Sequence, residues 1–239
     1  MNRAKGGGWE FLEYLAPPRL GFTWSAGSGC DVQCSVRTRG VCWAEKIVKR
    51  LGRFCPLCPG FRPHLHDGTR GTPNRLHEPL NRKKPSVITP VSTGDLFGLE
   101  PAQTEAILSV VRKASWHIFA ILTKAPDRAA CEEYPDNVAF GVTVNEQADT
   151  WRLEDLEAIK ARWRWAIFEP LYGPVDYDFT FLDWIIIGHQ TKPEIQPEGA
   201  WVEGILERAP GVPVFMKSSL RYEPFRRESM VSGAEVMSA

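Results

Sequence analysis

Seven short apolar runs, separated by segments of helical periodicity, are the feature that most constrains the fold of this chain. They lie at residues 20–24, 86–90, 117–122, 138–142, 165–168, 184–187 and 212–216. Most are apolar throughout, as strands are when both faces of a parallel sheet are covered. The pattern therefore predicts a sheet of buried parallel strands.

Helical patterns occupy the intervals between these runs. The predicted helices lie at residues 42–51, 101–114, 148–161 and 199–209. Alternating strands and helices are typical of βα units. Seven strands favour a complete or partial TIM-type (β/α) barrel of parallel strands, with a short open sheet as the alternative. The expected organisation is an N-terminal extension at 1–19, an α/β barrel at 20–220 with a cysteine-rich loop region at 30–84, and a flexible tail at 221–239.

Composition excludes several classes of protein. Of 239 residues, 43% are apolar and 24% are charged, which is typical of a globular protein and not of a disordered or fibrous one. Lys+Arg and Asp+Glu both number 29, so a highly basic nucleic-acid-coating protein is excluded, although a local basic groove is not. The apolar runs are too short to cross a bilayer, and residues 1–8 hold no apolar signal region. We expect a cytoplasmic location and no membrane partner.

Five of the six cysteines crowd into one short stretch, and only Cys131 is remote. The five are Cys30, Cys34, Cys42, Cys55 and Cys58. Disulfides are rare in the cytosol, so such crowding indicates a metal site. Three thiolates leave one iron of a [4Fe–4S] cluster open, whereas four ligands close a site, as in structural zinc. We expect the first three cysteines to hold an open cluster, with zinc as the main alternative.

Cys55 and Cys58 form a separate Cys-x2-Cys pair with less clear chemistry. They predict a zinc knuckle completed by His64 or His66, or no metal, ahead of a replacement thiolate for the cluster. The two histidines alternate, so both can face one metal ion or one phosphate. A plain loop is the default interpretation of this segment.

Polar residues follow most of the apolar runs, and the carboxyl ends of parallel strands meet at one edge. We expect Lys124 and Glu169 to act as catalytic residues there, and Asn145 to contact a ligand. Burying an unpaired charge is costly, so Lys124, Glu169 and Lys217 should pair with one another or with a ligand. For Asp95 the sequence leaves two roles open, a second ligand contact and capping of the next turn.

The order of motifs resembles a known family. Cys30-x3-Cys34 followed by Cys42-Trp-Ala-Glu resembles the cluster loop of radical S-adenosylmethionine proteins, although seven residues separate Cys34 from Cys42 where two are usual. From about residue 20 to 220 the chain resembles the phage Gp37/Gp68-like family of unknown function, which is related to radical S-adenosylmethionine proteins and distantly similar to spore photoproduct lyase-type proteins. The motifs that carry this are Thr23-Trp24, Gly94-Asp95-Leu96-Phe97-Gly98, Leu122-Thr123-Lys124, Glu169-Pro170-Leu171 and Asp183-Trp184-Ile185.

The resemblance implies a function. A [4Fe–4S] cluster would bind S-adenosylmethionine, with Thr93, Gly94 and Asp95 beside its amino end, and a reductant protein would supply electrons. The implied substrate is a nucleotide or nucleic acid. Two alternatives remain open: a zinc-stabilised, non-enzymatic barrel protein, and a metal-independent barrel enzyme that uses Lys124 and Glu169 as acid and base. The sequence leaves the oligomeric state open.

Overall fold

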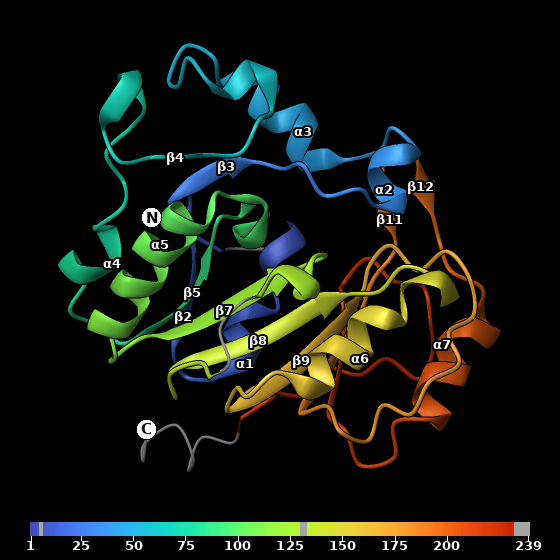
Figure 1. The fold of residues 1–239 in the computed structure, drawn as a ribbon. Coiled ribbons are helices and arrows are strands. Elements are labelled where there is room, and N and C mark those ends of the chain that lie inside the picture. The colour runs from blue at the N-terminus through green and yellow to red at the C-terminus, as the bar shows by residue number, and fades with distance from the viewer. Residues whose placement is uncertain (5–6, 130–132, 232–239) are drawn as a thin grey trace.

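An eight-stranded sheet forms the centre of the molecule (Figure 1). The computed structural model describes residues 1–4, 7–129 and 133–231, so Cys131 lies outside the described residues. From one edge to the other the strands are β1 (Asn2–Arg3), β2 (Leu20–Trp24), β5 (Ser86–Pro90), β7 (Ile118–Thr123), β8 (Val138–Thr143), β9 (Trp163–Phe168), β10 (Trp184–Ile187) and β13 (Val214–Met216). All neighbours from β2 to β13 are parallel, and β1 is antiparallel to β2.

The seven predicted runs are the seven parallel strands of this sheet, with ends displaced by one or two residues in four of them. β5, β8, β10 and β13 are buried at every position. Burial of both side-chain faces explains why these strands are apolar throughout, without alternation.

Three helices cover one face of the sheet. They are α5 (Pro101–Lys113), α6 (Trp151–Ala158) and α7 (Gly199–Glu207). α5 begins at Pro101, where the missing N–H has no helical partner to lose. Apolar residues of all three helices share one core with the strands, among them Ile107, Leu153 and Ile205. Each of the three lies within a helical segment predicted from the sequence.

The prediction of a TIM-type barrel is wrong, because the sheet does not close. Within the described residues β13 pairs with no strand other than β10, and no pairing joins it to β1 or β2. In the described ranges no α-helix separates β7 from β8 or β9 from β10, so the described helices are too few to surround a closed barrel. Large side chains also fill the second face: Trp165 and Trp184 are fully buried there.

Residues from both ends of the described chain cover this second face. Phe11, just before α1 (Leu12–Leu15), packs on Trp165 with ring centroids 5.5 Å apart. The backbone N–H groups of Met230 and Val231 donate 3.1 Å hydrogen bonds to the carbonyls of Tyr14 and Leu15. Both the segment predicted as an extension and the one predicted as a tail therefore contribute buried residues to this core.

The cysteine-rich lobe, residues 30–76, connects β2 to β5 above the carboxyl edge of the sheet (Figure 1). Its elements are α2 (Ser35–Thr38), α3 (Trp43–Val48), η2 (Lys49–Leu51), η3 (Cys58–Gly60), β4 (His64–Leu65) and η4 (Thr69–Gly71). A small sheet of β4, β3 (Gly27–Gly29) and β6 (Thr93–Gly94) anchors the lobe.

The remaining elements are short. They are η1 (Gly7–Trp9), α4 (Glu78–Asn81), η5 (Leu96–Gly98), η6 (Pro126–Arg128), η7 (Gln147–Asp149), β11 (Gln190–Thr191) and β12 (Glu194–Ile195). β11 and β12 form a two-stranded antiparallel sheet. No helix in the described part of the chain combines the length and apolar character that spanning a membrane requires.

Candidate metal centre

Four side chains of the cysteine-rich lobe converge on one point. The potential ligand atoms of Cys55, Cys58, His64 and His66 all lie within 4.8 Å of one another, and all four residues are buried. The Sγ atoms of Cys55 and Cys58 lie 3.1 and 3.7 Å from Nε2 of His64. Two thiols and two imidazoles are a ligand set typical of zinc, so the group can hold a metal ion.

Local structure places these four side chains. The N–H of Cys58 donates to the carbonyl of Cys55 at 3.2 Å, so the Cys-x2-Cys segment forms one tight turn before η3. His64 lies on β4, and His66 follows two residues later, on the same side of the extended chain. β4 pairs with β3, which brings the two histidines over the cysteine turn.

Backbone carbonyls orient both imidazoles. Nδ1 of His64 lies 2.8 Å from the carbonyl oxygen of Arg62, and Nδ1 of His66 lies 2.9 Å from that of Ser25. An Nδ1–H that donates to a carbonyl leaves Nε2 unprotonated, as in the outer shell of zinc sites. Nε2 of His66 is buried and has no hydrogen-bond partner. Leaving such an acceptor unsatisfied is costly, and a bound cation would satisfy it.

The Cys58 thiol resists ionisation unless a cation is bound beside it. Burial, and then the adjacent Cys55, raise the pKa of the Cys58 thiol to about 12, and a hydrogen bond from Ser28 acts in the opposite direction. A metal ion reverses this effect, because it deprotonates the thiols that coordinate it. The Ser28 and Thr93 hydroxyls lie 2.9 Å apart, so the cysteine turn is linked to β6.

Cys30, Cys34 and Cys42 are free and partly exposed. In the part of the chain that the structure describes, the four-residue group alone brings three or more potential ligands together, and it contains none of these three thiols. Gly29, the residue before Cys30, has a positive φ of 87°, a conformation that favours glycine. A side chain at this position would place its Cβ 2.1 Å from the Arg62 carbonyl oxygen. Assignment of a cluster to these three cysteines stays a prediction.

Cys30 nevertheless lies near the polar edge of the sheet. Burial first, and then the charge of Asp95, raise the pKa of its thiol to about 12; Lys124 and Cys34 have smaller effects in opposite directions. Cys30 and Cys42 both pack against the small core of the cysteine-rich lobe, which consists of Val48, Cys55, Cys58 and Phe61.

Asp95, one of the predicted ligand contacts, uses its carboxylate within the protein. It caps η5 by accepting a hydrogen bond from the N–H of Phe97, and it accepts two more, from the Thr123 hydroxyl and the Lys124 N–H. Thr93 and Gly94 lie on β6 beside β3. These contacts show the capping role, while cofactor binding by Thr93, Gly94 and Asp95 stays a prediction.

Glu169 and Lys217 form an ion pair at the carboxyl ends of β9 and β13, as the cost of burying a lone charge predicts. The Lys217 side chain is only 3% exposed and also donates to the Gly8 carbonyl.

Lys124 contacts Asp95 through its backbone. Asn145 donates from Nδ2 to the Pro170 carbonyl at 2.7 Å. Catalysis by Lys124 and Glu169 stays a prediction.

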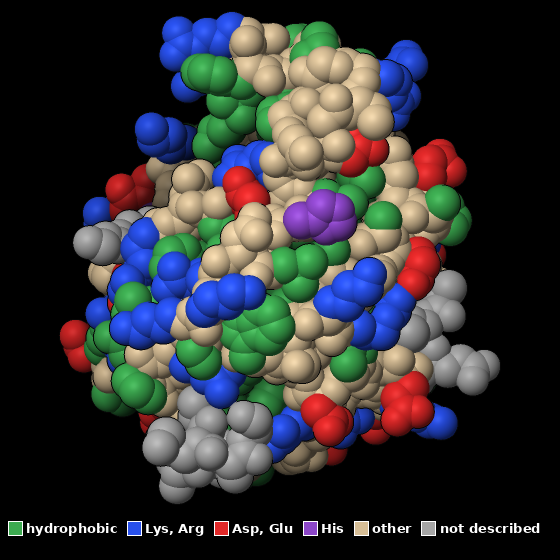
Figure 2. Space-filling model, turned by 90° about the vertical axis from the view of Figure 1, so that its left-hand side faces the viewer, with side chains coloured by type: hydrophobic (Ala, Val, Ile, Leu, Met, Phe, Trp, Pro, Cys, Tyr) green, Lys and Arg blue, Asp and Glu red, His purple; other side chains and the backbone are tan. Residues whose placement is uncertain are grey.

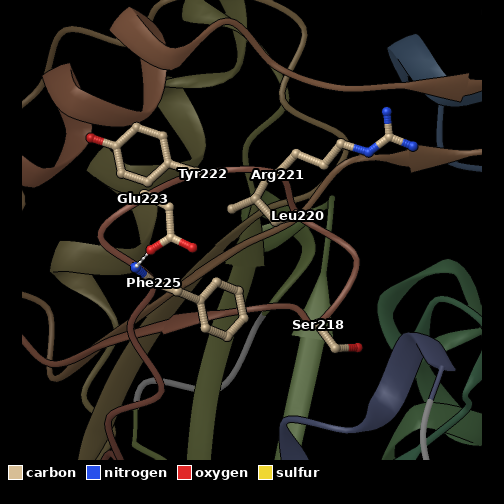
Figure 3. Close-up of a pocket in the computed structure, with 6 residues that line it drawn as sticks. All are labelled: Ser218, Leu220, Arg221, Tyr222, Glu223 and Phe225. Atoms are coloured by element: carbon tan, nitrogen blue, oxygen red, sulfur yellow. Dashed lines mark hydrogen bonds between the residues drawn. The ribbon is translucent and has the colours of Figure 1, made fainter.

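An open hollow of about 530 Å³ lies beyond the end of β13 (Figure 3). It is lined by Ser218, Leu220, Arg221, Tyr222, Glu223 and Phe225. The Glu223 carboxylate accepts a hydrogen bond from the Phe225 N–H across the same turn. The hollow shares no residue with the metal group or with the predicted site residues, so it adds nothing to their chemistry.

The sequence analysis predicted part of the four-residue group, as a zinc knuckle of Cys55 and Cys58 completed by His64 or His66, whereas the group contains both histidines. A Cys-x2-Cys pair and a His-x-His pair lie within 12 residues, and each pair presents two ligands on one side. Ser25 and Ser28, which hydrogen bond to the ligands His66 and Cys58, could not be recognised from the sequence, because they lie in a different segment of the chain. Their role depends on the pairing of β3 with β4.

An open α/β sheet carrying a lobe with a buried Cys2His2 group defines an α/β protein with a candidate metal centre. The family described as a protein of unknown function, DUF5131, matches residues 20–235, and the chain belongs to that family. The comparisons found no curated protein and no solved structure that matches the chain.

Proposed function

We propose that this chain is a zinc protein in which Cys55, Cys58, His64 and His66 bind one Zn²⁺ ion. The ion fixes the cysteine-rich lobe above the carboxyl edge of the sheet. The observation that carries the proposal is the convergence of four buried ligand atoms, one of which, Nε2 of His66, has no hydrogen-bond partner among the described residues.

The donor set favours zinc over the commoner cations. Calcium and magnesium prefer oxygen ligands, and this group offers sulfur and nitrogen. Four protein ligands complete a tetrahedral zinc site and leave no position for water or substrate. The proposed ion is therefore structural, and chemistry on a substrate takes place elsewhere.

The lobe needs such an ion because its own core is small. Its separate core contains only Val48, Cys55, Cys58 and Phe61 as fully buried members. A segment of this length with so little buried apolar surface has limited stability of its own, and metal ligation contributes directly to folding. The four ligands join the cysteine turn to β4 and hence to β3.

A second function builds on the same lobe. Cys30 lies within electrostatic range of Asp95, Cys34 and Lys124, at the edge where the predicted site residues gather. We retain the proposal that Cys30, Cys34 and Cys42 hold a [4Fe–4S] cluster that binds S-adenosylmethionine, with electrons from a reductant protein and a nucleotide or nucleic acid as substrate. The zinc ion would then fix the lobe that carries these thiols.

Metal analysis tests both proposals. Protein purified without oxygen should contain about one zinc ion per chain, as a four-ligand site requires. The variant Cys58→Ser should lose zinc, and Cys42→Ser should retain it. If a cluster is present, iron and sulfide should disappear in Cys42→Ser.

A chelator added to the wild-type protein provides a measurement that does not depend on a variant's folding. Zinc removal should increase hydrogen exchange in residues 30–76 and leave the strands of the main sheet protected. Wild-type protein that lacks zinc after purification from zinc-supplemented medium would refute the zinc centre. Absence of iron and sulfide under anaerobic conditions would refute the cluster.

A further inference from the structure

The cysteine-rich lobe is strongly basic in a chain with no net charge. Residues 30–76 contain nine Lys and Arg but only three Asp and Glu, whereas the whole chain contains 29 of each. The rest of the chain therefore carries the matching negative excess. Segregation of charge on this scale indicates a polyanionic partner for the basic part.

The positive charge is concentrated at the tip formed by α3, η2 and residues 53–54, called here the lobe tip. Lys46, Lys49, Arg50 and Arg53 are all exposed there. Of these four, only Lys49 has an ion-pair partner among the described residues, namely Glu45. Neighbouring cations without counter-charges create a positive potential that attracts anions.

Two aromatic rings are exposed on the same tip. Trp43 is 46% exposed and Phe54 is 58% exposed. The Arg53 guanidinium lies 4.5 Å from the centre of the Phe54 ring. Figure 2 shows Lys and Arg side chains on both flanks of the upper part of the molecule. Exposed rings between cationic side chains are the combination with which proteins bind single strands of nucleic acid.

We propose that the lobe tip is a binding surface for single-stranded nucleic acid. Lys46, Arg50 and Arg53 contact phosphates, while bases stack on Trp43 and Phe54. Because these contacts involve charge and ring faces, binding does not depend on base sequence. The inference rests on the proposed zinc centre only in that Cys55 directly follows the tip and holds it in place.

The shape of the tip favours nucleic acid over other anionic partners. α3 has six residues, which is too short to lie along a membrane as an amphipathic helix. Protein interfaces have cores depleted in charged residues, whereas here four exposed cations lie between the two exposed rings along the chain.

Binding is tested by fluorescence anisotropy with zinc-replete protein and a labelled oligothymidylate. Three phosphate contacts should give a slope of about −2 for the logarithm of the binding constant against that of salt concentration. The triple variant Lys46→Glu/Arg50→Glu/Arg53→Glu should weaken binding at least about tenfold and flatten this slope. Trp43→Ala should weaken binding about tenfold and leave the slope unchanged.

A matched control separates position from net charge. Lys113→Glu/Lys160→Glu/Lys192→Glu changes the charge by the same amount at exposed positions outside the lobe, and should keep wild-type affinity. Equal losses in the two triple variants would overturn the proposal, as would no binding at low salt. Tighter binding to phosphatidylserine vesicles than to the oligonucleotide would assign the tip to lipid and overturn it too.

Zinc content, measured in every sample, distinguishes this proposal from the zinc centre. Zinc-replete wild-type protein that fails to bind overturns the surface alone. Wild-type protein that contains no zinc when purified from zinc-supplemented medium, yet binds with the same dependence on Lys46, Arg50 and Arg53, overturns the zinc centre and supports the surface.

Discussion

The hydroxyl group of Thr123 donates a 2.7 Å hydrogen bond to Oδ1 of Asp95, 28 residues earlier in the chain. Together with the bonds from the Phe97 and Lys124 N–H groups, this contact fastens the end of β7 to η5. One buried carboxylate therefore holds two neighbouring strand ends at the edge below the cysteine-rich lobe.

Replacing Asp95 should destabilise the protein strongly. Asp95→Ala leaves a buried N–H group, a partly buried N–H group and a buried hydroxyl without their acceptor, so the free energy of unfolding should fall by about 3 kcal/mol. Urea denaturation checks this value. Asp127→Ala, at an exposed carboxylate on η6, should change it by less than about 0.5 kcal/mol. Equal effects of the two substitutions would contradict the anchoring role.

The ion pair of Lys217 with Glu169 should show a marked asymmetry between single and double variants. Glu169→Gln leaves the buried Lys217 ammonium without its counter-ion and should cost about 3 kcal/mol of stability. The double variant Glu169→Leu/Lys217→Met removes both charges and should be more stable than Glu169→Gln. Thermal and urea unfolding give the comparison, and a double variant no more stable than Glu169→Gln would contradict the pairing.

Ser28 should tune the affinity of the metal centre without binding the ion. Its hydroxyl hydrogen bonds to the Cys58 sulfur, so Ser28→Ala should weaken zinc binding about tenfold, as outer-shell changes do. Competition with a chromophoric chelator measures this. Ser25→Ala is the matched control, because Ser25 contacts His66 through its backbone carbonyl and keeps that contact. Wild-type zinc affinity in Ser28→Ala would contradict the assignment.

His117 should make the protein less stable in mild acid. Burial lowers the pKa of its ring below the ordinary 6.5. Hydrogen bonds with the Pro79 and Arg82 backbone partly oppose this effect, and the charges of Arg82 and Arg19 add smaller decreases. Below pH 6.5 the unfolded chain therefore takes up a proton that the folded chain resists, and stability falls as the pH decreases.

The variant His117→Asn should reduce this pH dependence. Between pH 7.5 and pH 5.5 the wild type should lose up to about 1.4 kcal/mol more stability than the variant, the free energy of one pH unit below the ordinary pKa. Any zinc released in acid affects both proteins alike. His77→Asn, at an exposed ring, should follow the wild-type curve. Parallel curves for His117→Asn and the wild type would contradict the prediction.

The strands could be predicted because their signal is local. Val138–Thr143 and Trp184–Ile187 are buried on both faces, and apolar runs of this length read as strands without any tertiary information. Closure into a barrel is not a local property. Whether the sheet closes depends on the size of Trp165 and Trp184 and on the packing of α1 against them. α1 lies in a segment that the sequence analysis predicted to be outside the domain.

Part of the candidate site was predictable for the same reason. The pairing of Glu169 with Lys217 followed from the cost of a lone buried charge at a strand end. The joining of Cys55 and Cys58 with both His64 and His66 required the pairing of β4 with β3, which sets the two histidines over the cysteine turn. No periodicity in residues 52–66 encodes that pairing, so the sequence left several alternatives open.

The contact of residues 230 and 231 with Tyr14 and Leu15 sets an order for folding during synthesis. The sheet can assemble as soon as Met216 has left the ribosome, but one of its faces lacks these last residues until about fifteen more have emerged. During that interval apolar surface around Tyr14 and Phe215, whose rings pack 4.8 Å apart, is less well covered. A nascent chain stalled shortly after β13 should therefore recruit chaperones more strongly than one stalled well beyond residue 231.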